Sequence, residues 1–135
     1  MPKRTYIDTC LLIAAFKGEG ELGRRALSVL DDPDRMLVVS DAVRLEAMPM
    51  ARYHKQQEEV EFYEEVFGQA ENIAWDNTAL QQALAIAESH GVAAMDAIHV
   101  AHAAVAGVAE FISAERPTKP MFRVKAIALR SIRDS

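Results

Sequence analysis

The chain contains 135 residues, of which 50% are hydrophobic and 26% are charged. This length suffices for one domain with a buried core, and the composition excludes a disordered or fibrous chain. The single cysteine, Cys10, excludes an internal disulfide and a cysteine-rich zinc site, and it fits a reducing cytoplasm. We find no signal sequence and no apolar run long enough to span a membrane, so we expect one cytoplasmic domain over residues 1–135 with no membrane partner.

The net charge of −5 argues against a nucleic-acid-binding protein, but the charges are unevenly distributed. Six basic residues and one acidic residue follow Glu115, whereas residues 1–115 carry nine basic and nineteen acidic residues. The simplest interpretation is a sheet edge and tail that happen to be basic. The alternative is an acidic site beside a basic surface that holds phosphate groups.

The first half of the chain alternates between strand-like and helix-like segments. Residues 4–8 and 36–40 are short β-rich or continuous apolar runs, which predict strands of a parallel sheet. Apolar side chains and their spacing predict the other elements of this half as helices, over residues 11–16, 19–31, 41–51 and 55–69.

The second half continues this alternation. Three further strands are expected, over residues 71–75, residues 109–113 and, as a candidate fifth strand, residues 122–126. Asn77 and Thr78 are expected to cap a helix that ends near His90, and residues 94–105 predict an alanine-rich, largely buried helix. Strands that alternate with helices predict a three-layer α/β/α domain with a central parallel sheet.

Four acidic residues stand at special positions in such a fold. Asp8 and Glu115 come at the ends of the first and fourth expected strands. Glu46 lies in the helix after the second strand, and Asp96 lies at the start of the alanine-rich helix. Because open parallel sheets form their sites outside the carboxyl ends of the strands, we expect these carboxylates to face one cavity.

Each of these acids also has a purely structural interpretation. Asp8 and Asp96 could cap the helices that begin beside them, since aspartate is a favoured N-cap residue. Glu46 could be an exposed helix residue, and Glu115 a surface turn residue beside Arg116. Four carboxylates at one edge would, however, repel one another unless a cation neutralised them. Oxygen ligands suit Mg²⁺ or Mn²⁺, and two such ions can assist the displacement at a phosphodiester.

Several neighbouring side chains leave alternatives open. Thr9 and Ser113 could bind metal-bound water or the carboxylates, or they could serve only in a cap and a turn. His99 and His102 follow Asp96 on the same helix. Because no further histidine or cysteine stands at a zinc-like spacing, we favour a place in the core or at a dimer surface for both histidines.

Four motifs resemble those of the PIN-domain family, and within it the VapC-like toxin ribonucleases of type II toxin–antitoxin systems. They are Tyr6-Ile7-Asp8-Thr9-Cys10-Leu11-Leu12-Ile13, Val39-Ser40-Asp41-Ala42-Val43-Arg44-Leu45-Glu46, Met95-Asp96-Ala97-Ile98-His99-Val100-Ala101 and Phe111-Ile112-Ser113-Ala114-Glu115. The resemblance implies a parallel sheet flanked by helices, a homodimer, a cognate antitoxin as partner, and cleavage of RNA that depends on Mg²⁺ or Mn²⁺. It maps three core acids of the family onto Asp8, Glu46 and Asp96.

The fourth motif departs from the family pattern. The family usually has an aspartate after the hydroxyl residue and often another acid two positions on, whereas this chain has Glu115, Arg116 and Pro117. Glutamate reaches one methylene further and could hold a metal through water, so we expect Asp8, Glu46, Asp96 and Glu115 to be the catalytic and metal-binding residues. The alternatives to a ribonuclease are a catalytically weak module that binds RNA or protein, and a DNA nuclease.

The helices over residues 41–51 and 55–69 carry more apolar side chains than one face can bury. We therefore expect a homodimer or a complex with an antitoxin. The side chains on which this expectation depends are Met48, Met50, Phe62 and Phe67.

Overall fold

The computed structural model describes all 135 residues of the chain. One sheet contains the strands β1 (Lys3–Ile7), β2 (Arg35–Ser40), β3 (Glu71–Ile73), β4 (Glu110–Ser113) and β5 (Leu129–Ser131). All neighbouring strands are parallel, in the order β3-β2-β1-β4-β5. The helices are α1 (Thr9–Lys17), α2 (Gly20–Leu30), α3 (Asp41–Tyr53), α4 (Gln57–Gln69), α5 (Asn77–His90), α6 (Ala94–Ala106) and the 3₁₀ helix η1 (Pro120–Arg123).

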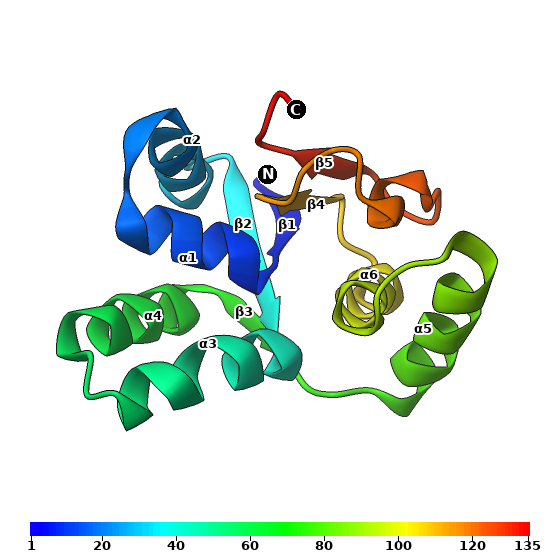
Figure 1. Cartoon of the computed structure of the whole chain (residues 1–135), viewed down its shortest axis with the longest axis horizontal. Coiled ribbons are helices and arrows are strands. Elements are labelled where there is room, and N and C mark those ends of the chain that lie inside the picture. Colours follow the sequence, from blue (N-terminus) through cyan, green and yellow to red (C-terminus); the bar gives the residue numbers. More distant parts are fainter.

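Helices cover the sheet from two sides (Figure 1). α1 packs against α2, α3 and α4 on one side, and α5 and α6 pack against each other on the other side. This arrangement confirms the predicted three-layer α/β/α fold with a central parallel sheet. None of the helices combines the length and the apolar character that a membrane span requires.

The central strands are apolar on both faces because helices cover both. Tyr6 and Ile7 point to opposite faces of β1 and are fully buried, as are their register partners Phe111 and Ile112 in β4. The rings of Tyr6 and Phe111 pack with their centroids 4.9 Å apart. These contacts fix β1 against β4, and they therefore fix the edge of the sheet at which both strands end.

The expectation of a fifth strand over residues 122–126 is wrong. Pro120–Arg123 form η1, and the fifth strand is Leu129–Ser131. Pro120 occupies the first turn of η1, where its fixed φ and missing N–H are tolerated, and Met121 is fully buried in the core. The burial of Met121 therefore outweighs the strand preference of the side chains that follow it, and the segment forms η1.

Two smaller differences concern β3 and the start of α5. β3 ends at Ile73, so it is two residues shorter than the expected strand, which reaches Trp75. Asp76 caps α5 in place of Asn77 or Thr78, because its carboxylate accepts the Thr78 N–H at 2.7 Å.

The direction of strand addition changes at β1. The chain runs from β1 through β2 to β3 toward one edge of the sheet, and it then adds β4 and β5 on the other side of β1. The segments that follow β1 and β4 therefore diverge, and a crevice forms where these two strands end. Open α/β sheets bind their ligands at such a position.

Candidate active site

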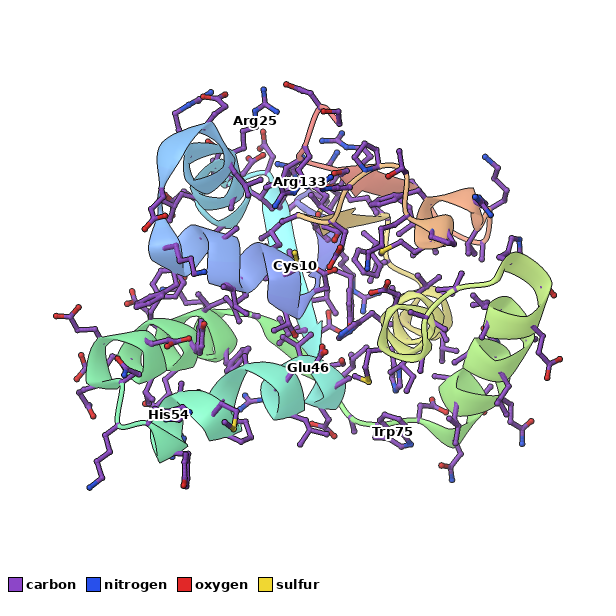
Figure 2. The ribbon with its side chains drawn as sticks, in the orientation of Figure 1. Cys10, Arg25, Glu46, His54, Trp75 and Arg133 are labelled. Atoms are coloured by element: carbon purple, nitrogen blue, oxygen red, sulfur yellow. The ribbon has the colours of Figure 1, made fainter.

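A cavity of about 310 Å³ opens at the carboxyl ends of β1 and β4. Figure 2 shows Cys10 of α1 and Glu46 of α3 in the region between these helices and α6. The lining contains all four acidic residues predicted from the sequence, so the structure brings them together from four separate segments. The lining residues are Asp8, Thr9, Cys10, Ile13, Glu46, Asp96, His99 and Glu115.

Asp8 is the most buried of the four acids, with 3% of its surface exposed. It is the N-cap of α1: its Oδ1 accepts the Leu11 N–H at 3.1 Å, and its Oδ2 accepts the Ser113 hydroxyl at 2.7 Å. Burial raises the pKa of Asp8 to about 6, although His99 and these two hydrogen bonds oppose the rise. Asp8 therefore caps α1 and faces the cavity at the same time.

Glu46 extends from α3 to the cavity and is held by two partners. Its Oε1 accepts the Thr9 hydroxyl at 2.8 Å and the Nε2–H of His99 at 2.5 Å. The hydrogen bond from His99 holds the pKa of Glu46 below its usual range, although partial burial opposes this shift. Glu46 is therefore an oriented carboxylate, and its second oxygen has no hydrogen-bond partner in the protein.

His99 connects Glu46 to the core of the domain. Only 3% of its surface is exposed, and its Nδ1 lies 2.8 Å from the hydroxyl of Tyr6. The Tyr6 hydroxyl lies in turn 2.7 Å from the hydroxyl of Ser40. Because a carboxylate can only accept, the Nε2 atom of His99 must carry a proton. This chain of hydrogen bonds fixes the direction of the Glu46 side chain from within the core.

Asp96 and Glu115 share one lysine. The Nζ of Lys119 lies 3.5 Å from Asp96 Oδ2 and 3.3 Å from Glu115 Oε2. Burial lowers the pKa of Lys119, but the two carboxylates outweigh burial and raise that pKa above its ordinary value. Ala93 is the N-cap residue of α6, so the capping interpretation of Asp96 is wrong.

The backbone at Glu115 is tied to its surroundings. Its N–H donates to the Ser113 hydroxyl at 3.0 Å, and its carbonyl accepts the Ser131 hydroxyl. Arg133 donates from Nε to the carbonyl of Ala114 at 2.6 Å. These contacts join the loop after β4 to β5 and the tail, so Glu115 occupies a fixed place beside the cavity.

The donor set fits a hard divalent cation. The donors are carboxylate oxygens, and burial, with Asp8 adding to it, raises the pKa of the Cys10 thiol to about 12, which disfavours a thiolate ligand. Asp8 forms no ion pair with a lysine or an arginine; its two side-chain hydrogen bonds come from the Leu11 N–H and the Ser113 hydroxyl. No three ligating side chains converge on one point: hydrogen bonds hold Asp8 and Glu46, and Asp96 and Glu115 share the Lys119 ammonium. Mg²⁺ or Mn²⁺ would therefore take some of its ligands through water, as Mg²⁺ commonly does.

The sequence does not predict two residues of this site. His99, expected in the core or at a dimer surface, is buried but contacts Glu46; its spacing of three from Asp96 on one helix is the available signal. Lys119 is predicted only as part of the basic tail. His102 lies in the core as expected, where its Nδ1 donates to the Ile98 carbonyl at 2.9 Å.

The apolar surplus expected on α3 and α4 is smaller than predicted. Met48 and Phe67 are buried, and Phe62 packs against the core, so the expectation is wrong for these three side chains. Three apolar side chains of α3 are exposed, namely Leu45, Met50 and Tyr53.

Comparison with known families identifies the domain. The sequence profile of the PIN domain matches residues 5–116. The chain belongs to the PIN-domain family. All four cavity acids of this PIN domain lie within the matched residues, and the resemblance seen in the sequence is confirmed. A comparison with curated proteins gives no significant match.

Two solved structures share the fold of this PIN domain. The crystal structure of VapBC2 from Rickettsia felis bound to a DNA fragment from their promoter has a TM-score of 0.72 and 12% identity, over 95% of this chain and 98% of that chain. A toxin–antitoxin complex from Klebsiella pneumoniae has a TM-score of 0.73 and 20% identity, over 92% of this chain and 95% of that chain. At these identities the likeness shows a shared fold.

Proposed function

We propose that this PIN domain is an endoribonuclease that depends on Mg²⁺ or Mn²⁺. The observation that carries the proposal is that Asp8, Glu46, Asp96 and Glu115 line one cavity. Such a group of carboxylates repels itself without a cation, and PIN domains are generally metal-dependent nucleases. Hydrolysis of a phosphodiester is the reaction that this site supports best.

Asp8, Glu46 and Asp96 are the residues that would hold the first ion, directly or through water. Asp8 contributes a buried carboxylate, and Glu46 contributes an oxygen whose direction is fixed by His99. Glu115 reaches one methylene further than an aspartate and would assist at this ion or at a second, weaker position. An ion held there would lower the pKa of a bound water and would neutralise charge on the phosphate.

The protein provides no separate general base in this cavity. His99 uses its Nε2 proton in the hydrogen bond to Glu46, and its Nδ1 lies against the Tyr6 hydroxyl. Lys119 lies between two carboxylates that raise its pKa, so Lys119 is a cation. The residues of the chain therefore act by binding, orienting and neutralising.

Single-stranded RNA is the proposed substrate. Arg116 follows Glu115 directly and is exposed, so its guanidinium is available to a phosphate beside the cavity. Arg123 and Lys125 are exposed further along the same segment. Attack by water needs no 2′-hydroxyl, so the same residues also suit a DNA substrate, which is the alternative to be tested.

The proposed biological role is that of a cytoplasmic toxin with a cognate antitoxin. One structure that shares the fold is a toxin–antitoxin complex, which supports this proposal. Leu45, Met50 and Tyr53 give α3 an exposed apolar surface, and such surfaces are typical of protein interfaces. The same surface supports a homodimer as the state of the free protein.

A binding module with weak catalysis is a second candidate function. The observation that favours it is the Lys119 ammonium between Asp96 and Glu115, together with the lack of three converging ligands. Such a protein would bind RNA or a protein partner and would leave RNA uncut with either ion.

The test is cleavage of RNA and DNA single strands of the same sequence, with analysis of the new ends. We expect RNA to be cut only with Mg²⁺ or Mn²⁺ and to carry no cyclic phosphate, because water attacks in place of the 2′-hydroxyl. Cyclic phosphate ends formed in chelator would contradict the metal-dependent reaction. Cleavage of DNA alone would replace RNA as the substrate, and binding without cleavage would establish the binding module.

A further inference from the structure

Lys119 is the only lysine or arginine that forms an ion pair with a carboxylate of the cavity. Its Nζ lies 3.3 Å from Glu115 Oε2 and 3.5 Å from Asp96 Oδ2. One ammonium group therefore bridges two acids that come from different segments, α6 and the loop after β4. This is the relation to two carboxylates that a bound cation would have.

The local fold brings Lys119 to this place. Its N–H donates to the carbonyl of Arg116 at 3.0 Å, which closes the turn after Glu115, and it immediately precedes η1. Met121 is fully buried, and η1 packs against α5 and α6 (Figure 1). The side chain thus starts from a fixed backbone position. It remains 41% exposed, so it can also leave the carboxylates without disrupting the core.

The other half of the cavity has no comparable cation. Asp8 is held by the Ser113 hydroxyl and a backbone N–H, and Glu46 is held by Thr9 and His99. One divalent ion and one ammonium would neutralise most of the charge of four carboxylates. A second divalent ion would have to enter beside a positive charge already in place.

We propose that Lys119 is a built-in counter-cation that takes the place of a second divalent ion between Asp96 and Glu115. The protein would then bind one divalent ion, and Asp96 would still be able to help hold it, because Lys119 contacts only its Oδ2 atom. This inference rests on the proposed metal-dependent function and specifies how many divalent ions that site holds. A second ion enters only when the ammonium moves away.

The test is calorimetric titration of the full chain with Mn²⁺, without RNA. Lys125 is exposed and forms no ion pair, so Lys125→Met is the matched control for Lys119→Met. We expect one Mn²⁺ per chain for the wild type and for Lys125→Met. Lys119→Met should bind a second Mn²⁺ and should bind the first about tenfold more tightly, equivalent to about 1.4 kcal/mol. Lys119→Arg keeps a cation and should retain the wild-type stoichiometry.

The thermal unfolding temperatures of the wild type and Lys119→Met provide a second test, which does not depend on cleavage. In chelator, Lys119→Met should unfold about 2–4 °C below the wild type, because two carboxylates lose their cation. Added Mn²⁺ should remove this difference.

Equal Mn²⁺ stoichiometry and affinity in the wild type and Lys119→Met would overturn the inference. If the wild type cuts RNA but binds Mn²⁺ in the same way as Lys119→Met, only the inferred role of Lys119 is contradicted, and the proposed nuclease function stands. A protein whose Mn²⁺ binding depends on Lys119, but which cuts no nucleic acid, contradicts the proposed nuclease function alone.

Discussion

The Nε2 atom of His99 lies 2.5 Å from Oε1 of Glu46, and it joins a buried ring of α6 to a partly exposed carboxylate of α3. The opposite ring nitrogen is held by the Tyr6 hydroxyl. Glu46 therefore has a fixed direction before any ligand binds. A ligand that needs this carboxylate finds it already oriented, which lowers the entropy cost of binding.

His99→Phe tests this relationship, because phenylalanine fills the space but donates no hydrogen bond. The pKa of Glu46 should return toward its usual range, and Mn²⁺ affinity should fall about tenfold, as is typical when a partner of a metal ligand is removed. Tyr6→Phe removes only the outer hydroxyl and should have a smaller effect. Calorimetry on both variants is the measurement, and wild-type Mn²⁺ affinity in His99→Phe would contradict the orienting role.

Asp8→Asn should stabilise the metal-free protein at neutral pH. The pKa of Asp8 is about 6 in the folded protein, above its ordinary value of 3.8. Because the folded-state pKa is raised, the stabilising contribution is complete below the unfolded-state pKa and is lost as pH rises through about 6. Asparagine keeps the N-cap oxygen without the charge, so the free energy of unfolding should rise by about 2–3 kcal/mol near pH 8.

Urea unfolding of the wild type and Asp8→Asn in chelator measures this effect. The difference between the two proteins should be large near pH 8 and should nearly vanish near pH 4. Added Mn²⁺ should stabilise the wild type and leave Asp8→Asn almost unchanged. If Asp8→Asn is no more stable than the wild type near pH 8, burial does not raise the pKa of Asp8 in the folded protein.

Glu115→Ala should weaken cleavage less than Asp8→Ala, mainly by raising the Mn²⁺ concentration required. We expect that concentration to rise about threefold to tenfold, as for a ligand that acts through water. Glu115→Asp shortens the side chain by one methylene and should keep part of the function. Glu88→Ala on the exposed surface of α5 is the control. If Glu115→Ala and the wild type need the same Mn²⁺ concentration for cleavage, Glu115 is not part of the site, and the site consists of the other three acids.

A different carboxylate, that of Glu110, stabilises the sheet at the amino ends of its strands, opposite to the cavity. Glu110 is buried and accepts hydrogen bonds from Arg35 at 2.9 Å and Thr5 at 2.7 Å. Burial opposes ionisation, but these partners hold the pKa of Glu110 below its usual range. Arg35→Met should therefore lower the free energy of unfolding by about 2–4 kcal/mol, because a buried charge loses its main partner.

The control for this prediction is Arg24→Met, which removes an exposed ion pair and should change stability by less than about 1 kcal/mol. Denaturant unfolding compares the two variants at one pH. Cleavage per folded molecule should be unchanged in Arg35→Met, since Arg35 lies at the start of β2, away from the cavity. Equal stability of the two variants would contradict the importance of the buried pair.

Strand-end placement predicts two of the four cavity acids, Asp8 and Glu115, whereas Glu46 and Asp96 lie on helices and are predicted mainly through the motifs that resemble the PIN-domain family. Asp8 and Glu115 follow strands of one parallel sheet, so their meeting needs no knowledge of side-chain directions. The roles of His99 and Lys119 also depend on how side chains are directed in the folded protein. Whether His99 reaches Glu46 depends on how α6 is rotated relative to α3, and sequence spacing along one helix does not define that rotation.

The missed fifth strand has a similar cause. Residues 122–126 contain β-forming side chains, but Pro120 favours a first helical turn and Met121 is drawn into the core. The strand that pairs with β4 is short and lies at the edge of the sheet. Intrinsic preference is a weak guide for such strands, since packing against neighbours decides them.

Single-turnover cleavage of one single-stranded RNA, followed as Mn²⁺ is added to chelator-treated protein, tests the proposed metal-dependent reaction most directly. The comparison is between the wild type and the Asp8→Asn/Asp96→Asn variant, with RNA affinity measured on the same samples. We predict that the wild-type rate rises with Mn²⁺ to saturation, and that the variant binds RNA at least as well but cleaves about a thousandfold more slowly or not at all. Cleavage by the variant at the wild-type rate, or by the wild type in chelator, would contradict a nuclease that acts through these carboxylates.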